Sequence, residues 1–241
     1  MDQPNIGTAG WTIPRQFADR FPAEGSALER YSTWFGAAEI NSSFHRPHRA
    51  SPWERWRDSV PPHFRFSVKL PKEITHRRKL LDFDEPLGAF IEQVDLLGDK
   101  LAILLVQLPP KLEFDADVAN AFFEALAARS QARIACEPRH PSWFESQVDA
   151  LLDDLQVARV AADPSICPQA AVPGGWTGLA YWRLHGSPDM YRSAYGQRVH
   201  NYAAELKRAL DAGHHAWCIF DNTASSAAMG DALAVAEDFS S

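Results

Sequence analysis

Eight short apolar runs are spread along the chain, and each ends on polar or charged residues. Stretches with helical spacing separate most of the runs, an order that predicts parallel strands joined by crossover helices. Polar strand ends gathered on one face are how a (β/α)8 barrel builds a pocket. The sequence therefore predicts an α/β fold, a single (β/α)8 TIM-type barrel with a site at the carboxyl ends of its strands. The runs cover residues 6–8, 37–41, 64–69, 102–107, 133–137, 158–163, 180–185 and 217–222.

Six helices are expected between and after these runs. Ser26, Asp115 and Ser142 are predicted N-caps, Pro86 is predicted to begin a helix, and two more are expected at 196–212 and 225–239.

Two stretches break the regular alternation, so the barrel is expected to be irregular after strands 2 and 6. Residues 42–63 are rich in Pro, Arg and Trp and contain one short helical piece, and residues 164–178 are predicted to form a long loop. The pattern resumes after both, which favours one domain over residues 1–241. An open doubly wound sheet is the main competitor, but residues 7–11 do not form its glycine-rich phosphate turn.

Charge and composition narrow the class of protein. The net charge of -7 gives no global basic field for nucleic acid, and no apolar run is long enough for a membrane span. The N-terminus lacks the pattern of a signal peptide. Three cysteines without a Cys-x-x-Cys pair fit a reducing compartment, so we expect a cytoplasmic protein.

The fifth run ends in the densest group of chemically active side chains. Glu137, Arg139 and His140 lie within four residues, just before a predicted helix. A carboxylate beside an arginine stays ionised, and a histidine beside a carboxylate can be tuned for proton transfer. The alternative is an internal salt bridge, with His140 capping the turn.

The second and seventh runs each place two polar residues on one face. Glu39 and Asn41 are two apart on a strand, as are Arg183 and His185, so each pair points to one side of the sheet. The alternatives are a buried polar pair and a buried arginine that pairs with Glu39 or Asp221.

A basic loop follows the third run, and aromatic residues follow several others. Lys69 and His76 are candidates for holding an anion, whereas Arg77 to Lys79 read most simply as a solvated surface. Aromatic side chains past strand ends can stack on a flat ligand, although packing under loops explains any single one equally well. These aromatic candidates are Trp11, Phe44, Trp143, Tyr191 and Tyr195.

A metal centre is not favoured by this pattern. No ligand spacing typical of a metal site occurs among the candidate N and O donors, and Lys69, Arg139 and Arg183 at the same rim would repel a cation. We expect no organic cofactor. The donors are Glu39, His45, His76, Glu137, His140, Asp163, His185 and Asp221.

Seven ordered motifs resemble the YecE-like family, which is domain of unknown function 72. The resemblance runs from about residue 6 to about residue 236, and it implies a TIM-type barrel with no established reaction. His45 and Asp221 depart from the family pattern, where Tyr and Asn are usual. The motifs lie at residues 7–11, 39–44, 69–76, 107–110, 137–143, 183–186 and 222–223.

These observations lead to a hypothesis of an enzyme, of hydrolase or lyase type, that acts on an anionic, phosphorylated or nucleotide-like small molecule. Glu137, His140, His185 and Glu39 would do acid–base chemistry. Glu137 and Arg183 must then lie within common reach of one ligand, within about 15 Å of each other. The residues expected to bind the ligand are Asn41, Lys69, His76, Arg139, Arg183, Trp11, Phe44, Trp143, Tyr191, Tyr195 and Asn222.

Two other functions compete with this hypothesis. One is a metal-assisted phosphodiesterase or nuclease, which rests on analogy between folds. The other is a non-catalytic barrel that binds a ligand or nucleic acid, supported by the basic residues 77–79 and nearby aromatic side chains.

Overall fold

Parallel strands form the centre of the molecule in the computed structural model, which describes residues 3–239. Seven of the eight predicted runs form one strand each, and the run at 158–163 forms two, β6 and β7. The strands are β1 (Asn5–Thr8), β2 (Ala37–Ile40), β3 (Arg65–Lys69), β4 (Leu101–Gln107), β5 (Arg133–Glu137), β6 (Val157–Arg159), β7 (Ala161–Asp163), β8 (Gly174–Gly175), β9 (Leu179–Leu184) and β10 (His215–Phe220).

The strands belong to two sheets. One sheet has the order β1-β10-β9-β7, and the other has the order β2-β3-β4-β5-β6-β8. All neighbouring strands are parallel except β8, a two-residue strand that runs antiparallel to β6. Because the strands are parallel, their carboxyl ends lie on one face, where the polar residues at their ends meet.

The two sheets approach each other at both edges. Between β1 and β2, the backbone N–H of Gly10 donates to the carbonyl of Glu39 at 2.8 Å, and Ala9 and Glu39 form a single bridge. On the other side, Val160 connects β6 to β7 and donates its N–H to Cys136 on β5 at 2.8 Å. The predicted parallel α/β organisation is thus confirmed, with the strands divided between two sheets.

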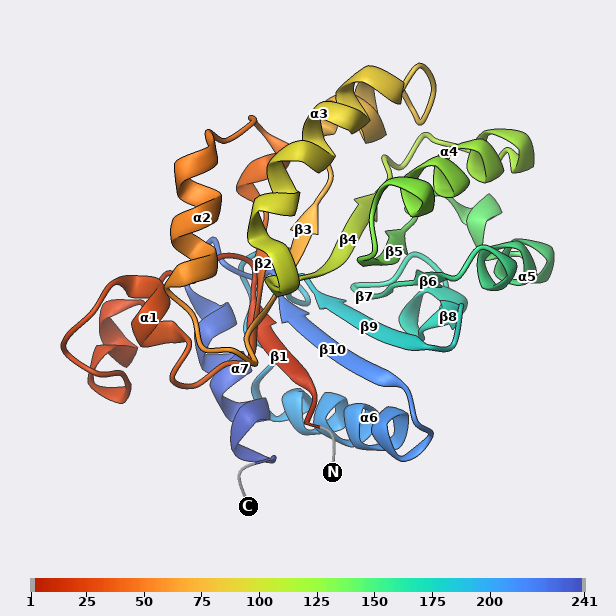
Figure 1. The fold of residues 1–241 in the computed structure, drawn as a ribbon. Helices are drawn as coiled ribbons and strands as arrows, with labels where there is room; N and C mark the ends of the chain where they lie inside the picture. The colour runs from red at the N-terminus through yellow and green to blue at the C-terminus, as the bar shows by residue number, and fades with distance from the viewer. Residues whose placement is uncertain (1–2, 240–241) are drawn as a thin grey trace.

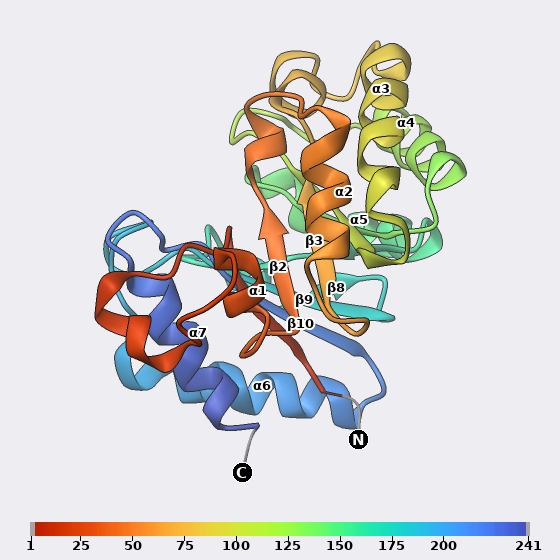
Figure 2. The ribbon, with the colours of Figure 1, turned by 60° about the vertical axis from the view of Figure 1, so that its left-hand side comes forward.

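Helices cover the outer faces of these sheets. In Figures 1 and 2, α6 and α7 lie against β10 and β1, whereas α3 and α4 cover the opposite side of the molecule. The α-helices are α1 (Ala27–Tyr31), α2 (Ala50–Asp58), α3 (Asp84–Val94), α4 (Ala116–Arg129), α5 (Ser146–Asp154), α6 (Val199–Asp211) and α7 (Ala227–Glu237). Shorter helical turns are η1 (Arg15–Arg20), η2 (Ser42–Phe44), η3 (Glu73–Arg77), η4 (Asp95–Lys100), η5 (Pro141–Phe144), η6 (Pro168–Ala171) and η7 (Gly196–Arg198).

Two of the predicted helix caps are confirmed. Ser26 forms a capping box with Glu29, and the Asp115 side chain accepts from the N–H of Val118 at 3.1 Å. The helix predicted to begin at Pro86 begins two residues earlier, since a proline is tolerated in the first turn of a helix.

The predicted cap at Ser142 is wrong. His140 precedes the turn η5 and accepts from the N–H of Ser142, and Glu145 is the N-cap position of α5. The physical reason is that the Ser142 hydroxyl accepts from the backbone of Phe114 at 2.8 Å, which ties this turn to the preceding loop.

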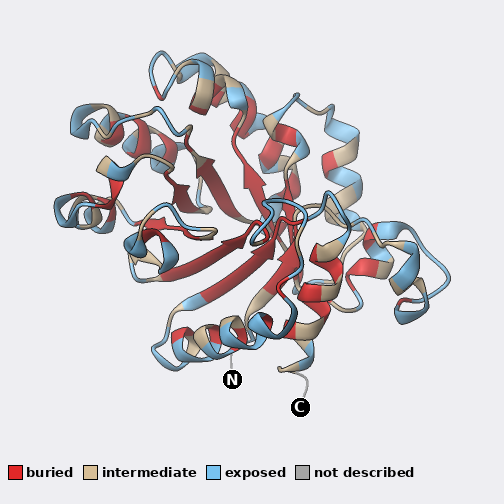
Figure 3. Cartoon of the chain, turned by 180° about the vertical axis from the view of Figure 1, so that it is seen from behind, coloured by how far each residue is buried: buried red, intermediate tan, exposed pale blue. Residues whose placement is uncertain are grey.

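The two irregular stretches also match the expectation. Residues 42–63 contain η2 and α2, and no α-helix forms within the described residues 164–178. Figure 3 shows the buried residues concentrated in the strands and on the inner faces of the helices. Within residues 3–239, no helix combines the length and the apolar character needed to cross a bilayer.

Candidate active site

Arg183 lies at the centre of a fully buried group of charges. Its Nε and Nη2 donate to the two oxygens of Glu39 at 2.8 and 2.7 Å, in the bidentate geometry that suits a guanidinium. Its Nη1 donates to Glu137 at 2.8 Å, and its Nη2 also donates to Asp221 at 3.0 Å. One arginine therefore joins carboxylates from β2, β5 and the end of β10.

These contacts keep Arg183, Glu137 and Asp221 charged although they are buried. Burial alone would lower the pKa of Arg183, but Glu39, Asp221 and Glu137 raise it well above its ordinary value. Burial would likewise raise the pKa of Glu137, yet Arg139 and Arg183 hold it well below its ordinary value. For Asp221, burial is opposed mainly by Arg183, and its pKa is lowered. Glu137 and Asp221 are therefore carboxylates at neutral pH.

His185 lies above Arg183 and completes the buried ion-pair cluster, which we define as Glu39, Glu137, Arg183, His185 and Asp221. Its Nε2 lies 2.7 Å from Nη2 of Arg139 and 3.1 Å from Glu137. Its Nδ1 lies 3.0 Å from Asp221, so the imidazole ring contacts a carboxylate through each nitrogen and the guanidinium of Arg139 through Nε2. Arg139 also pairs with Glu137.

Two further residues, Tyr181 and Ser67, belong to this network and were not predicted from the sequence. The Tyr181 hydroxyl lies 3.1 Å from Glu39 and 3.0 Å from the hydroxyl of Ser67, and both residues are buried. Tyr181 precedes Arg183 by two residues on β9, so the same alternation that paired Arg183 with His185 could have found it.

A pocket of about 660 Å³ opens above the cluster. Six of the predicted site residues line it, together with Asp221 from the buried ion-pair cluster. Its lining includes Asn41, Phe44, His45, Lys69, Lys72, His76, Gln107, Arg139, Tyr191 and Asp221. Glu39, Glu137, Arg183 and His185 have no exposed surface and lie beneath this pocket.

Lys69 ends β3 and projects toward the pocket with only 8% of its surface exposed. Its Nζ lies 4.1 Å from the centre of the Phe44 ring, a cation–π contact, and it has no carboxylate or hydrogen-bond acceptor within residues 3–239. Burial, with Arg183 adding to it, lowers the pKa of Lys69 to about 8 against the opposing pull of the cluster carboxylates.

Two other polar atoms of the pocket wall lack partners. In the part of the chain that the structure describes, Oδ1 of Asn41 and Nε of Arg139 are buried without a hydrogen bond. The amide of Asn41 donates to Asp221 at 3.3 Å, so only its oxygen is left over. Buried polar groups are normally satisfied, and unsatisfied ones beside a pocket point to a ligand or water.

His76 adds a titratable group to the same wall. Its Nδ1 lies 2.9 Å from the hydroxyl of Thr75, which leaves Nε2 for the pocket. Burial lowers the pKa of His76, and Lys69 and Lys72 lower it further. The imidazole is therefore mostly neutral at pH 7 and can accept a proton.

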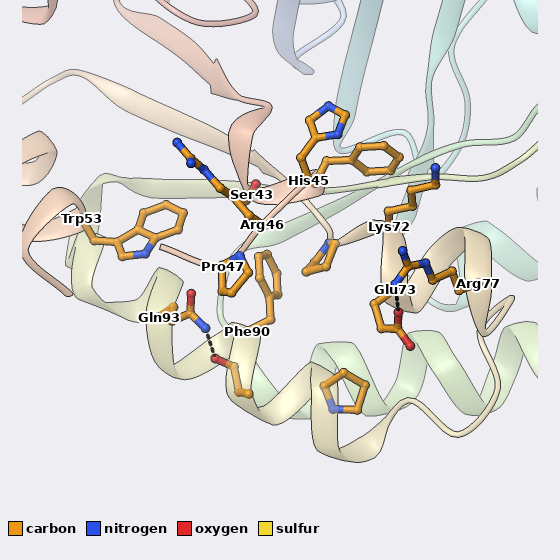
Figure 4. Close-up of a pocket in the computed structure, with 14 residues that line it drawn as sticks. Ser43, His45, Arg46, Pro47, Trp53, Lys72, Glu73, Arg77, Phe90 and Gln93 are labelled. Atoms are coloured by element: carbon orange, nitrogen blue, oxygen red, sulfur yellow. Dashed lines mark hydrogen bonds and ion pairs between the residues drawn. The ribbon is translucent and has the colours of Figure 1, made fainter. Parts of the chain in front are cut away.

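A second pocket of about 480 Å³ adjoins the first and shares Phe44, His45 and Lys72 with it. Figure 4 shows Glu73 against Arg77 on one wall, at 3.0 Å, and Trp53 on the opposite side.

Three predicted aromatic contacts lie elsewhere. Trp11 packs edge to face on Trp56 at 5.2 Å, and Trp143 is buried with its Nε1 donating to the carbonyl of Leu112. Tyr195 is buried and donates to the backbone carbonyl of Asp163, the last residue of β7. For these residues the structure shows packing under loops, the alternative stated for them above, and none lines the pocket.

Two predicted polar site residues also lie away from the pocket. His140 contacts the Ser142 hydroxyl at 2.9 Å and caps its own turn. Asn222 is fully buried and donates to Asp231 at 2.7 Å. No group of three or more His, Cys, Asp or Glu side chains within residues 3–239 has the arrangement of a metal site.

Comparison with known proteins identifies curated relatives that match part of the chain. The chain is 31% identical over 147 residues to the UPF0759 protein YunF of Bacillus subtilis, which covers 58% of this chain and 51% of that protein. It is 26% identical over 140 residues to the UPF0759 protein YecE of Escherichia coli K12, covering 58% of this chain and 49% of that one. The chain thus spans about half the length of the curated relatives it matches.

Solved structures share the fold over the whole chain. A DUF72 family protein from Enterococcus faecalis has a TM-score of 0.81 at 19% identity, covering 99% of this chain and 96% of that one. A DUF72 family protein from Thermotoga maritima has a TM-score of 0.79 at 20% identity, covering 99% and 100%. The family model described as protein of unknown function DUF72 matches residues 5–241, so the chain belongs to that family.

Proposed function

We propose that the pocket binds a small anionic molecule and that the protein is an enzyme acting on it by proton transfer. The observation that carries the proposal is the uneven pairing of charges. Every carboxylate of the buried ion-pair cluster contacts Arg183, whereas Lys69 and Lys72 on the pocket wall have no carboxylate partner within the described residues. A phosphate or carboxylate would supply the missing acceptor.

The remaining pocket groups suit an organic anion. Arg139 offers an unpaired Nε, and Asn41 offers an unpaired oxygen that can accept from a hydroxyl. Phe44 and the exposed ring of Tyr191 provide apolar surface. Phosphorylated small molecules combine these features: an anionic group, hydroxyls and an apolar carbon skeleton.

Proton transfer would use groups on the pocket wall. His76, with its lowered pKa, and Asp221, the one carboxylate that lines the pocket in the described chain, are the candidate bases, and His76 can return the proton it has taken up. In this proposal Glu39, Glu137 and His185 hold Arg183, Arg139 and Asp221 in position, because they have no exposed surface. Asp221 is then a catalytic residue, and the other cluster members are positioning residues.

We also propose that the two sheets close into one eight-stranded (β/α)8-type barrel. The bridge between Ala9 and Glu39 and the continuous chain from β6 through Val160 to β7 support closure at the two edges. Closure would bring all eight strand ends to one rim around the pocket.

Calorimetric titration with inorganic phosphate and with pyrophosphate tests the anion site. We expect one saturable site whose affinity falls at least about tenfold in Lys69→Met, the usual loss when a charged contact is removed. Lys207→Met is the matched control, because Lys207 also lies over an aromatic ring but on the exposed surface of α6. Absence of saturable binding, or equal losses in both variants, would contradict the anion site.

Exchange of carbon-bound protons tests the reaction. Phosphate esters and carboxylates that bind are incubated with the protein in D₂O, and deuterium incorporation and turnover are followed by NMR. We expect catalysed exchange that is lost in His76→Gln with binding retained. Binding of every ligand without exchange or turnover would mean a binding protein.

A further inference from the structure

Lys69 differs from an ordinary anion-binding lysine in its surroundings. It is 8% exposed, it is held over the Phe44 ring, and it has no acceptor within residues 3–239. A buried ammonium group without a hydrogen-bonded counterion is costly, so this position raises the share of neutral amine above that of an exposed lysine, although the Phe44 ring favours the ammonium. The neutral amine is the form in which a lysine is a nucleophile.

The charges around Lys69 come from every element packed against it. Arg183 disfavours its ammonium form, whereas Glu39, Glu137 and Asp221 favour it. His76 and Lys72 line the same pocket. The three carboxylates are already paired with Arg183, so burial and the neighbouring cation prevail and the pKa of Lys69 is about 8. At pH 7 about a tenth of the amine is then neutral, roughly 300-fold more than for an ordinary lysine.

We propose that Lys69 is a nucleophile that forms an imine with an aldehyde or ketone group of the anionic ligand. The identity of the ligand as an anion rests on the proposed function, whereas the reactivity of the amine does not. The substrate class is therefore a phosphorylated or carboxylated aldehyde or ketone. Lys72 and Arg139, on the same pocket wall, would hold the anionic group while the carbonyl carbon meets Nζ.

The step balances without any further reactant. Nζ attacks the carbonyl carbon, the carbon–oxygen double bond becomes a single bond, and a carbinolamine forms. The carbinolamine loses its oxygen as water, whose two hydrogens derive from the amine, and leaves a carbon–nitrogen double bond. Uptake of one proton from solvent gives the iminium, which draws electrons from the adjacent carbon and makes its proton acidic. His76 lines the same pocket and is the candidate base for that proton.

Reductive trapping tests the imine. The protein is incubated at pH 7 with glycolaldehyde phosphate and sodium cyanoborohydride, whose hydride adds to the iminium carbon, and the modified lysines are mapped by mass spectrometry. We expect Lys69 to be labelled at least tenfold faster than Lys207. Labelling of Lys69 no faster than of surface lysines would overturn the proposal.

The pH dependence gives a second, independent readout. The labelling rate of Lys69 should rise about tenfold from pH 6 to pH 7 and level off above pH 8, whereas surface lysines keep reacting faster up to about pH 10. A rate at Lys69 that follows the surface lysines through pH 10 contradicts an activated amine. Lys69→Arg, which keeps the charge, should abolish labelling at this position while the protein stays folded.

Uncharged glycolaldehyde separates this proposal from the anion site. If both aldehydes label Lys69 at equal rates and inorganic phosphate does not compete, the amine is reactive and the anion site is wrong. If phosphate binds saturably but Lys69 is not labelled, the anion site holds and the imine is wrong.

Discussion

The buried ion-pair cluster and the wall of the pocket above it treat charge in opposite ways. In the cluster, Arg183 satisfies three carboxylates at once, and none of its members apart from Asp221 reaches the pocket surface. On the wall, Lys69 and Lys72 lack any carboxylate partner in the described chain. We expect the paired charges to specify how the strand ends fit together, and we propose that the unpaired ones bind a ligand.

Removing Arg183 gives the largest expected effect and tests whether the paired charges of the cluster stabilise the fold. Arg183→Met leaves Glu39 buried without its cation and Glu137 with Arg139 alone, and the free energy of unfolding should fall by about 3–5 kcal/mol. Urea denaturation measures the change. Arg208→Met is the control, because Arg208 pairs with Glu205 on the exposed face of α6 and should lose less than about 1 kcal/mol. Similar losses of unfolding free energy in both variants would show that the buried cluster stabilises the fold no more than an exposed ion pair.

Acid should also lower the free energy of unfolding by protonating the cluster carboxylates, with a smaller effect than Arg183→Met. The folded-state pKa values of Glu137 and Asp221 lie below their ordinary values of 4.5 and 3.8. Their stabilising contribution is thus complete above about pH 5 and is lost as pH falls below 4.5 and protons bind the unfolded chain. Urea midpoints measured from pH 6 to pH 3 should decline even in 0.5 M salt, which screens exposed pairs. Midpoints independent of pH in this range would refute the paired carboxylates.

The charge of Lys69 should destabilise the fold, unlike the paired charges of the cluster, and its removal should have the smallest effect on the free energy of unfolding. Its folded-state pKa of about 8 lies below the ordinary value of 10.5, so the ammonium destabilises the fold below pH 8 and the penalty disappears as pH rises toward 10.5. Lys69→Met should leave stability at pH 7 unchanged or raise it by up to about 2 kcal/mol, less any lost contact with Phe44. The difference from the wild type should shrink between pH 7 and pH 10. If Lys69→Met lowered the free energy of unfolding by more than about 1 kcal/mol at pH 7, Lys69 would stabilise the fold as the paired charges do, and the contrast would be wrong.

Much of the strand layout follows from the sequence because each run couples burial with a polar end. The alternation on β9 placed Arg183 and His185 on one face, and the pairing of Arg183 with Glu39 or Asp221 was stated as an alternative. The structure shows both pairings together, and Glu137 lies 2.8 Å from Arg183, well within common reach.

The depth of each side chain could not be read in the same way. Position at a strand end does not tell whether a residue lies on the pocket surface or one layer beneath it, since that depends on the stagger between neighbouring strands. Glu39 lies opposite Ser67, two residues before the end of β3, and is therefore buried, whereas Lys69 ends that strand and lines the pocket.

Tyr31 has a consequence for the edge where β1 and β2 meet. Its buried hydroxyl accepts from the N–H of Thr8 at 2.8 Å and donates to the carbonyl of Ala37 at 2.9 Å, so a side chain takes the place of a backbone ladder bond. Gly7 makes room for this contact, since a Cβ there would lie 2.1 Å from the Ala37 oxygen and 2.9 Å from the Tyr31 hydroxyl. One phenol from α1 therefore connects β1 to β2 through hydrogen bonds to the backbone of both strands. In hydrogen–deuterium exchange, Tyr31→Phe should therefore make the amide of Thr8, which loses its acceptor, exchange faster, one residue before the bridge between Ala9 and Glu39.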